Sequence, residues 1–103
     1  MTEPLDVLAI MAHPDDAELL CGGSLAKSSS EGQRVGVLDL TRGEKGSSGS
    51  REIRAKEASN ASAILGLSVR QNAGLADASL INDSQAKHIV VELIRELRPQ
   101  AVV

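Results

Sequence analysis

The hydrophobic and polar positions of this chain follow two different periods in turn. Short continuous apolar runs are typical of buried strands, and apolar residues at three- and four-residue spacing are typical of helices. The pattern predicts strands over residues 5–12, 35–40, 67–71 and 101–103, and helices over 16–31, 51–65 and 84–97. Such alternation favours a mostly parallel sheet with right-handed crossovers and helices on both faces. We therefore expect an α/β fold.

Each predicted helix carries one apolar face that should pack against the sheet. The expected inward residues are Leu19, Leu20, Leu25 and Ala26 in the first helix, Ile53, Ala58, Ala61, Ile64 and Leu65 in the second, and Ile89, Val90, Leu93, Ile94 and Leu97 in the third. Residues 41–50 are rich in Gly and Ser and predict a loop. Its Gly/Ser part, residues 43–50, has the composition of a linker, or beside a metal site it would be a mobile lid. Residues 72–83 predict a second loop.

The length of 103 residues limits the chain to one small domain with a single core. Hydrophobic residues make up 42% of the sequence, but Phe, Trp and Tyr are absent. The core must therefore be aliphatic, and the chain offers no ring on which a base or a sugar could stack. Because Val103 falls inside a predicted strand, we interpret residues 1–103 as the N-terminal part of one longer domain, incomplete at its C-terminus.

Charge and cysteine content argue against several classes of protein. A net charge of −3 with mixed signs gives no basic surface for nucleic acid. No apolar run approaches the roughly 20 residues needed to cross a membrane, and the acidic start of the chain does not resemble a signal peptide. A single cysteine cannot form an internal disulfide. We therefore expect a cytoplasmic protein that binds neither nucleic acid nor membrane.

Chemically reactive residues gather where the first predicted strand gives way to the first helix, a region where open α/β sheets bind ligands. In the segment 12–18, His13 and Asp16 lie three residues apart and can point into one crevice. Imidazole and carboxylate are good zinc ligands, and Asp15 between them could act as a base toward water. Asp15 and Glu18 also fit a capping box at a helix start. Capping does not explain His13 or Asp16, but the residues alone leave both interpretations open.

Six segments, in order and covering most of the chain, match one known family. They are residues 12–18, 21–26, 39–44, 52–58, 63–66 and 72–77. The set resembles the LmbE-like, or PIG-L, zinc-dependent deacetylases. It looks most like the branch that removes acetyl from an N-acetylglucosaminyl malate in bacillithiol biosynthesis. The resemblance implies a Rossmann-like α/β fold and a hydrolase that removes an N-acetyl group from a small N-acetylglucosaminyl conjugate.

The resemblance also implies roles for matching positions. His13 and Asp16 would be ligands of Zn²⁺, and Asp15 would be the general base that activates the attacking water. Arg54 would contact the substrate. The substrate pocket would also include Glu44 and Asp77.

Two family residues have no counterpart in this sequence. The third zinc ligand and a general acid, both histidines of a His-x-x-His segment after the fourth strand, are expected beyond Val103. The only other histidine, His88, is expected to be an exposed residue of the third helix rather than a replacement ligand. Glu18 is expected to anchor the start of the first helix.

Two further hypotheses stand beside the deacetylase. In the first, the chain is a non-catalytic fragment that binds metal weakly or has an assembly role, because it holds only two of the expected ligands. An unpaired sheet edge is prone to association, which leaves room for a partner chain or a homo-oligomer. In the second, the chain binds a nucleotide, but the segment 21–24 lacks the spacing of a dinucleotide or phosphate-loop motif.

Overall fold

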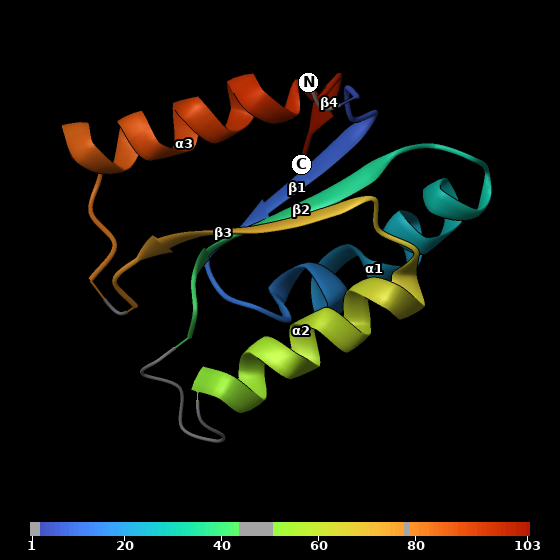
Figure 1. Ribbon diagram of the computed structural model, residues 1–103, viewed down its shortest axis with the longest axis horizontal. Coiled ribbons are helices and arrows are strands. Elements are labelled where there is room, and N and C mark those ends of the chain that lie inside the picture. Colours follow the sequence, from blue (N-terminus) through green and yellow to red (C-terminus); the bar gives the residue numbers. More distant parts are fainter. Residues whose placement is uncertain (1–2, 44–50, 78) are drawn as a thin grey trace.

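The computed structural model describes residues 3–43, 51–77 and 79–103 (Figure 1). The lid suggested for residues 43–50 therefore lies, apart from Gly43, outside the described residues. The elements are β1 (Val7–Met11), α1 (Asp16–Ser30), β2 (Val35–Thr41), α2 (Arg51–Leu65), β3 (Val69–Leu75), α3 (Ser84–Leu97) and β4 (Ala101–Val102). The strands form one sheet in the order β3-β2-β1-β4, and every neighbouring pair is parallel. Helices α1 and α2 cover one face of the sheet and α3 covers the other (Figure 1). The predicted α/β fold is confirmed.

Two layers of aliphatic side chains hold the sheet between its helices. The layer on the α1 side contains Ala9, Ala17, Leu25, Val35 and Val37, and the layer on the α3 side contains Leu5, Leu8, Leu38 and Leu97. Successive strand residues point to opposite faces, so β1 and β2 each contribute to both layers. Strands buried on both faces have nearly continuous apolar sequences, which is why these two could be predicted.

Strand β3 was predicted over residues 67–71 but runs from Val69 to Leu75, so this expectation was wrong by several residues. Polar residues hide the strand in the sequence because their side chains are bound rather than solvated. Arg70 pairs with a carboxylate of β2. The side-chain amide of Asn72 donates to the carbonyl oxygen of Thr41 at 2.7 Å. Part of the predicted second loop is therefore strand.

Four aliphatic side chains expected in the core lie at the surface instead. They are Leu19, Leu20, Ile53 and Ile64, which are 80%, 74%, 53% and 85% exposed. In α1 the cause is a kink at Cys21, whose φ of −145° and ψ of 20° prevent the two halves from sharing one face. In α2 the half-buried face includes the polar residues Arg54 and Ser62. The residues that α1 buries are Ala17, Gly22 and Leu25.

Helix α3 matches its prediction in bounds and in face. Its N-cap Asp83 accepts a hydrogen bond from a backbone N–H of the first turn at 2.8 Å, and Leu97 is fully buried at the other end. His88 lies on the outer face, where its ring is 72% exposed and pairs with Glu92 at 3.1 Å, as expected of a surface residue. Within the described ranges, no helix combines the length and apolar character needed to span a membrane.

Gly36 of β2 has no room for a side chain. A Cβ atom built there would lie 2.6 Å from Cδ1 of the buried Leu5 and 3.4 Å from the carbonyl oxygen of Val69. We expect Gly36→Ala to lower the free energy of unfolding by about 1–3 kcal/mol, the usual cost of overpacking. Gly23→Ala is the matched control, because a Cβ atom built there in α1 meets nothing within 4 Å beyond its chain neighbours and the nearby backbone of its own helix, and it should gain about 0.5–1 kcal/mol. Urea unfolding measures the stability of both variants. A Gly36→Ala variant as stable as the wild type would show that the core around Gly36 repacks to admit the methyl group.

Candidate metal and catalytic site

The loop after β1 lies at the carboxyl edge of the sheet, at the point where the strand order reverses. The chain passes from β1 to β2 and β3 on one side, and then crosses to β4 on the other side of β1 (Figure 1). Open parallel sheets bind ligands at such a switch point. Thr41 ties the loop to β2, because its backbone N–H and its hydroxyl both donate to the carbonyl oxygen of Ala12 at 3.0 Å. The loop is therefore fixed to the centre of the sheet.

His13 and Asp16 face each other across this loop. Asp16 Oδ2 accepts a hydrogen bond from the backbone N–H of His13 at 3.0 Å and lies 3.4 Å from Nδ1 of its ring. Two atoms that each lie about 2.1 Å from one tetrahedral zinc ion are about 3.4 Å apart. The side chains are 42% and 32% exposed, so both reach solvent. The pair fits one edge of a zinc coordination shell.

A full set of protein ligands is not assembled by these residues. Catalytic zinc takes three protein ligands and keeps one position open. Across residues 3–43, 51–77 and 79–103, no three His, Cys, Asp or Glu side chains are close enough together to hold a metal ion. Zinc binding by His13 and Asp16 with a third ligand therefore stays a prediction.

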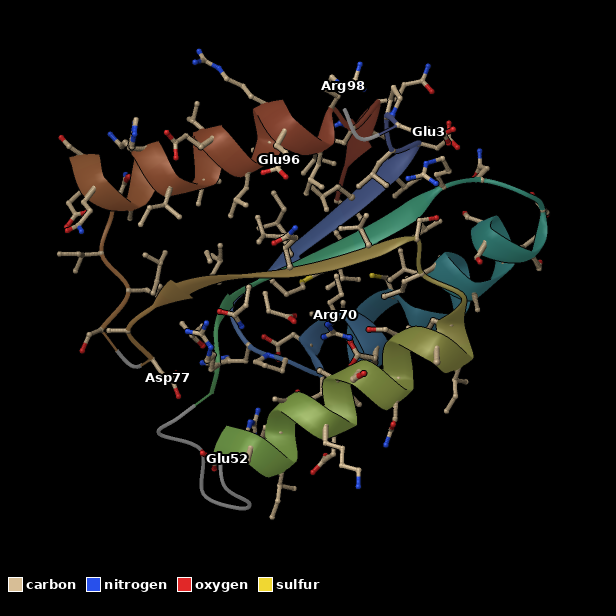
Figure 2. The ribbon with its side chains drawn as sticks, in the orientation of Figure 1. Glu3, Glu52, Arg70, Asp77, Glu96 and Arg98 are labelled. Atoms are coloured by element: carbon tan, nitrogen blue, oxygen red, sulfur yellow. The ribbon has the colours of Figure 1, made fainter. Side chains whose placement is uncertain are left out.

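Asp77 contacts the opposite side of the His13 ring. Its Oδ1 lies 2.7 Å from Nε2 of His13, and its side chain is 6% exposed. It comes from the segment after β3, 64 positions further along the chain, and lies at the carboxyl end of the sheet (Figure 2). The sequence assigned Asp77 to the substrate pocket, and that contact stays a prediction. In the structure, its carboxylate faces His13.

Asp15 is held in an uncommon conformation at the start of α1. Its φ of 80° and ψ of −16° lie in the left-handed region, which costs most residues about 1–2 kcal/mol but is tolerated by Asp and Asn. Its side chain makes no capping hydrogen bond to the described first turn of the helix. The capping-box interpretation is therefore wrong for Asp15. Asp15 is exposed, so its carboxylate is accessible to a ligand or to water.

Arg54 of α2 reaches the same loop. Its Nη2 donates to the carbonyl oxygen of Pro14 at 3.3 Å, and the side chain lines a cavity of about 220 Å³ together with Asp15 and Glu18. Its Nε is buried and has no hydrogen-bond partner among the described residues. Leaving such a donor unpaired costs free energy that a bound acceptor would recover. The placement suits the predicted substrate contact, whereas Glu44 lies outside the described residues.

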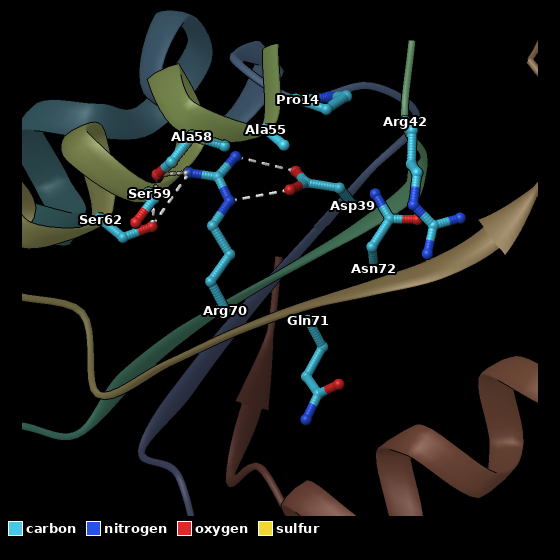
Figure 3. Close-up of a pocket in the computed structure, with 10 residues that line it drawn as sticks. All are labelled: Pro14, Asp39, Arg42, Ala55, Ala58, Ser59, Ser62, Arg70, Gln71 and Asn72. Atoms are coloured by element: carbon cyan, nitrogen blue, oxygen red, sulfur yellow. Dashed lines mark hydrogen bonds and ion pairs between the residues drawn. The ribbon is translucent and has the colours of Figure 1, made fainter. Parts of the chain in front are cut away.

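A buried ion cluster lies beneath the loop, between the sheet and α2 (Figures 2 and 3). The guanidinium of Arg70 contacts Asp39 through Nε–Oδ2 at 2.8 Å and Nη2–Oδ1 at 3.0 Å. Its Nη2 also donates to Glu18 Oε1 at 3.2 Å. The three side chains are 10%, 4% and 20% exposed. Glu18 thus ties the first turn of α1 to the sheet through Arg70 and not through a capping box.

Two carboxylates share one guanidinium in this cluster. Burial opposes the charge of Arg70, but the hydrogen bonds and charges of Asp39 and Glu18 outweigh it and hold the pKa of Arg70 above its ordinary value. Burial raises the pKa of Asp39, and its contacts with Arg70 offset this only in part, because Glu18 and Asp16 add negative charge. Sequence reasoning missed the cluster. The available signal was a charged residue inside each of two strands expected to be buried.

A cavity of about 310 Å³ opens beside the cluster (Figure 3). Ala55 and Ala58 of α2 form one wall, and Arg70 and Asn72 of β3 form part of another. Pro14 of the loop also borders it, so the cavity and the His13 loop are neighbours. Because the guanidinium of Arg70 is paired with Asp39 and Glu18, it lines this cavity as a bound cation and not as a free one.

Comparisons with known proteins identify the family. A model of the PIG-L family, described as GlcNAc-PI de-N-acetylase, matches residues 8–103. A 1D-myo-inositol 2-acetamido-2-deoxy-alpha-D-glucopyranoside deacetylase from Thermomonospora curvata is 29% identical over 129 aligned positions, covering 94% of this chain and 43% of the relative. The chain thus spans less than half the length of this relative.

Solved structures agree with this match. A conserved protein from Thermus thermophilus is 48% identical with a TM-score of 0.91, covering 95% of this chain and 44% of that one. The N,N'-diacetylchitobiose deacetylase from Pyrococcus horikoshii is 27% identical with a TM-score of 0.87, covering 93% and 39%. A 4-carboxy-2-hydroxymuconate hydratase from Pseudomonas putida is 26% identical with a TM-score of 0.81, covering 93% and 45%. The chain belongs to the PIG-L, or GlcNAc-PI de-N-acetylase, family.

Proposed function

We propose that this chain carries part of the active site of a zinc-dependent deacetylase acting on an N-acetylglucosaminyl conjugate. One observation carries the proposal: His13 Nδ1 and Asp16 Oδ2 face each other at 3.4 Å, a separation suited to one zinc ion. The neighbouring Asp15 has a carboxylate that is not used for capping. The family match and the deacetylases among the similar proteins support the same reaction class.

Each residue of the site has one task in this proposal. His13 and Asp16 would hold zinc, which when bound lowers the pKa of water to about 7 and polarises a carbonyl group. Asp15 accepts a proton from the attacking water at its carboxylate, and Arg54 binds a polar group of the substrate. Hydrolysis joins the water oxygen to the acetyl carbon and breaks the C–N bond, and the leaving nitrogen takes up the proton that was removed from the water. The products are acetate and an amino sugar.

The sugar is the common part of the proposed substrates. Two of the four similar proteins named above are a deacetylase of an inositol-linked sugar and a deacetylase of diacetylchitobiose. We propose a bacillithiol-type N-acetylglucosaminyl malate conjugate as the substrate, in line with the branch expected from the sequence. Because the chain has no aromatic residue, its own contacts with the sugar would be hydrogen bonds, with Arg54 among the donors.

A non-catalytic fragment is the second candidate. It rests on the lack of a third ligand near His13 and Asp16 within the described residues. Two ligands alone would bind zinc weakly and hold no defined open position. This candidate predicts substoichiometric zinc after dialysis and no turnover.

Removal of zinc tests the proposal. We expect the whole protein, with a third ligand in place beside His13 and Asp16, to release free amine from N-acetylglucosaminyl malate, to lose this activity after treatment with EDTA, and to regain it when zinc is added back. Residues 1–103 alone should be inactive, because catalytic zinc takes three protein ligands. Amine release, measured with a fluorogenic amine reagent, is compared for the malate conjugate, the inositol conjugate and N,N'-diacetylchitobiose. The highest rate should be found with the malate conjugate.

The control is His88→Ala, which removes the exposed histidine of α3 and should leave the zinc content and the rate unchanged. Stoichiometric zinc without amine release from any of the three conjugates would overturn the deacetylase. Water addition to an unsaturated carboxylic acid under the same conditions would instead favour the chemistry of the hydratase relative.

A further inference from the structure

We infer that Asp77 is a positioning residue that sets the proton and the orientation of the His13 ring, so that Nδ1 is turned towards Asp16. The contact itself is seen in the structure at 2.7 Å between Asp77 Oδ1 and His13 Nε2. Its consequence for zinc rests on the proposed function. The two parts can be tested separately.

Burial makes the Asp77 carboxylate require hydrogen-bond donors, and His13 supplies one of them. The Asp77 side chain is 6% exposed, compared with 32% for Asp16. A carboxylate removed from water has to be paired. An ionised carboxylate only accepts hydrogen bonds, so Nε2 of His13 carries the hydrogen. In the neutral ring the lone pair is then on Nδ1.

That lone pair is directed to the side of the ring where Asp16 lies. Asp16 Oδ2 is held there by the backbone N–H of His13 at 3.0 Å, and it lies 3.4 Å from Nδ1. Two electron-rich atoms at this distance favour a cation between them. Histidines that bind metals commonly donate their second ring N–H to a carboxylate, which fixes the tautomer. Asp77 occupies that position relative to His13.

The position of Asp77 argues for this role over a direct contact with substrate. The two cavities that border the loop after β1 are lined by residues of α1, α2, β2 and β3, by Arg42 and by the loop itself, and Asp77 lines neither of them. Its carboxylate is turned to the back of the ring, away from the side that Asp16 faces. A substitution of Asp77 should therefore affect metal affinity before it affects substrate affinity.

The experiment compares the wild type with Asp77→Asn and Asp77→Ala in long-range ¹H–¹⁵N NMR spectra of the metal-free protein, at a pH where both histidines are neutral. We expect the wild type to show His13 protonated at Nε2, with that hydrogen protected from exchange. Asp77→Ala should lose this protection. Asp77→Asn, whose amide can donate to Nε2, should move His13 towards the other tautomer, as amide replacement does in a catalytic triad. Zinc titration should show about 10–100-fold weaker binding for both variants.

Glu92→Gln is the matched control, because it makes the same chemical change beside the other histidine, His88. It should leave the His13 signals and the zinc affinity unchanged. Unaltered His13 signals in both Asp77 variants, or unaltered zinc affinity combined with a raised KM, would overturn the positioning role. If the tautomer shifts as expected but the wild type binds no zinc, the positioning role stands and the proposed function fails.

Discussion

Asp15→Asn should lower kcat by about 10²–10⁴-fold while zinc binding is retained, which is the usual contribution of a general base. Asp15 is the acidic residue of the loop whose side chain neither caps the helix nor faces His13. Removing its charge takes away the acceptor for the proton of the attacking water. The proposed zinc ligands His13 and Asp16 are untouched, so the metal content should not change.

Asparagine is the appropriate replacement at this position. Asp15 has a φ of 80°, and Asn adopts this left-handed conformation more readily than other residues with a side chain. The variant should therefore keep the stability of the wild type, and urea unfolding verifies that the loss is chemical. His13→Ala should differ from Asp15→Asn in its metal content, because it should lose the zinc together with the activity. A wild-type rate in Asp15→Asn would remove Asp15 from the mechanism.

Arg70→Met should destabilise the fold by about 3–5 kcal/mol, the usual cost of removing one partner from a buried ion pair. The substitution keeps most of the side-chain volume but leaves Asp39, which is 4% exposed, beside Glu18 without a cation. The free energy of unfolding of a small domain is only about 5–15 kcal/mol, so this loss is a large fraction of the total stability. Urea unfolding followed by circular dichroism measures the loss.

The pH dependence of the stability of Arg70→Met shows whether the variant is destabilised by the lost charge or by lost packing. Burial and neighbouring carboxylates already raise the pKa of Asp39 in the folded protein, and removing Arg70 takes away the contacts that lower it. A carboxyl group with a raised folded pKa binds protons more tightly when folded, so stability increases as the pH falls. The deficit of Arg70→Met should therefore shrink in acid.

Two controls accompany this variant. Arg95→Met, at an exposed position of α3, should change stability by no more than about 0.5 kcal/mol. The double variant Arg70→Met/Asp39→Leu removes the buried charge as well as its partner and should recover part of the loss. A deficit that is independent of pH and persists in the double variant would mean that Arg70 acts through packing alone.

The sequence predicted those elements in which local pattern and tertiary environment agree. Helix α3 was predicted in both bounds and face because a single apolar stripe runs along it, and in the structure Asp83 caps its N-terminus. Strand β3 was misplaced because Arg70 and Asn72 look like loop residues until their partners on β2 are known. The exposed Leu19 and Leu20 were assigned to the core because the kink at Cys21 leaves no pattern in the sequence.

The candidate site divides in the same way. His13 and Asp16 are close in sequence, so their spacing across the turn was enough to predict that they face each other. The contacts of Asp77 with His13 and of Arg70 with Asp39 join positions 64 and 31 residues apart. Such pairs depend on strand order and register, which a single sequence does not contain. The roles of Asp15, Arg54 and Glu44 remain predictions.

The two carboxylates on either side of the His13 ring follow strands that differ in how many neighbours they have in the sheet. His13 and Asp16 follow β1, which has a neighbour on each side, whereas Asp77 follows β3, which lies at an edge of the described sheet. Native proteins open locally from their least supported elements, well below the free energy of global unfolding. Fraying at the end of β3 would release the ring from Asp77 while the loop after β1 stays folded. Amide hydrogen exchange near residue 75 would therefore report how often the histidine is free to turn.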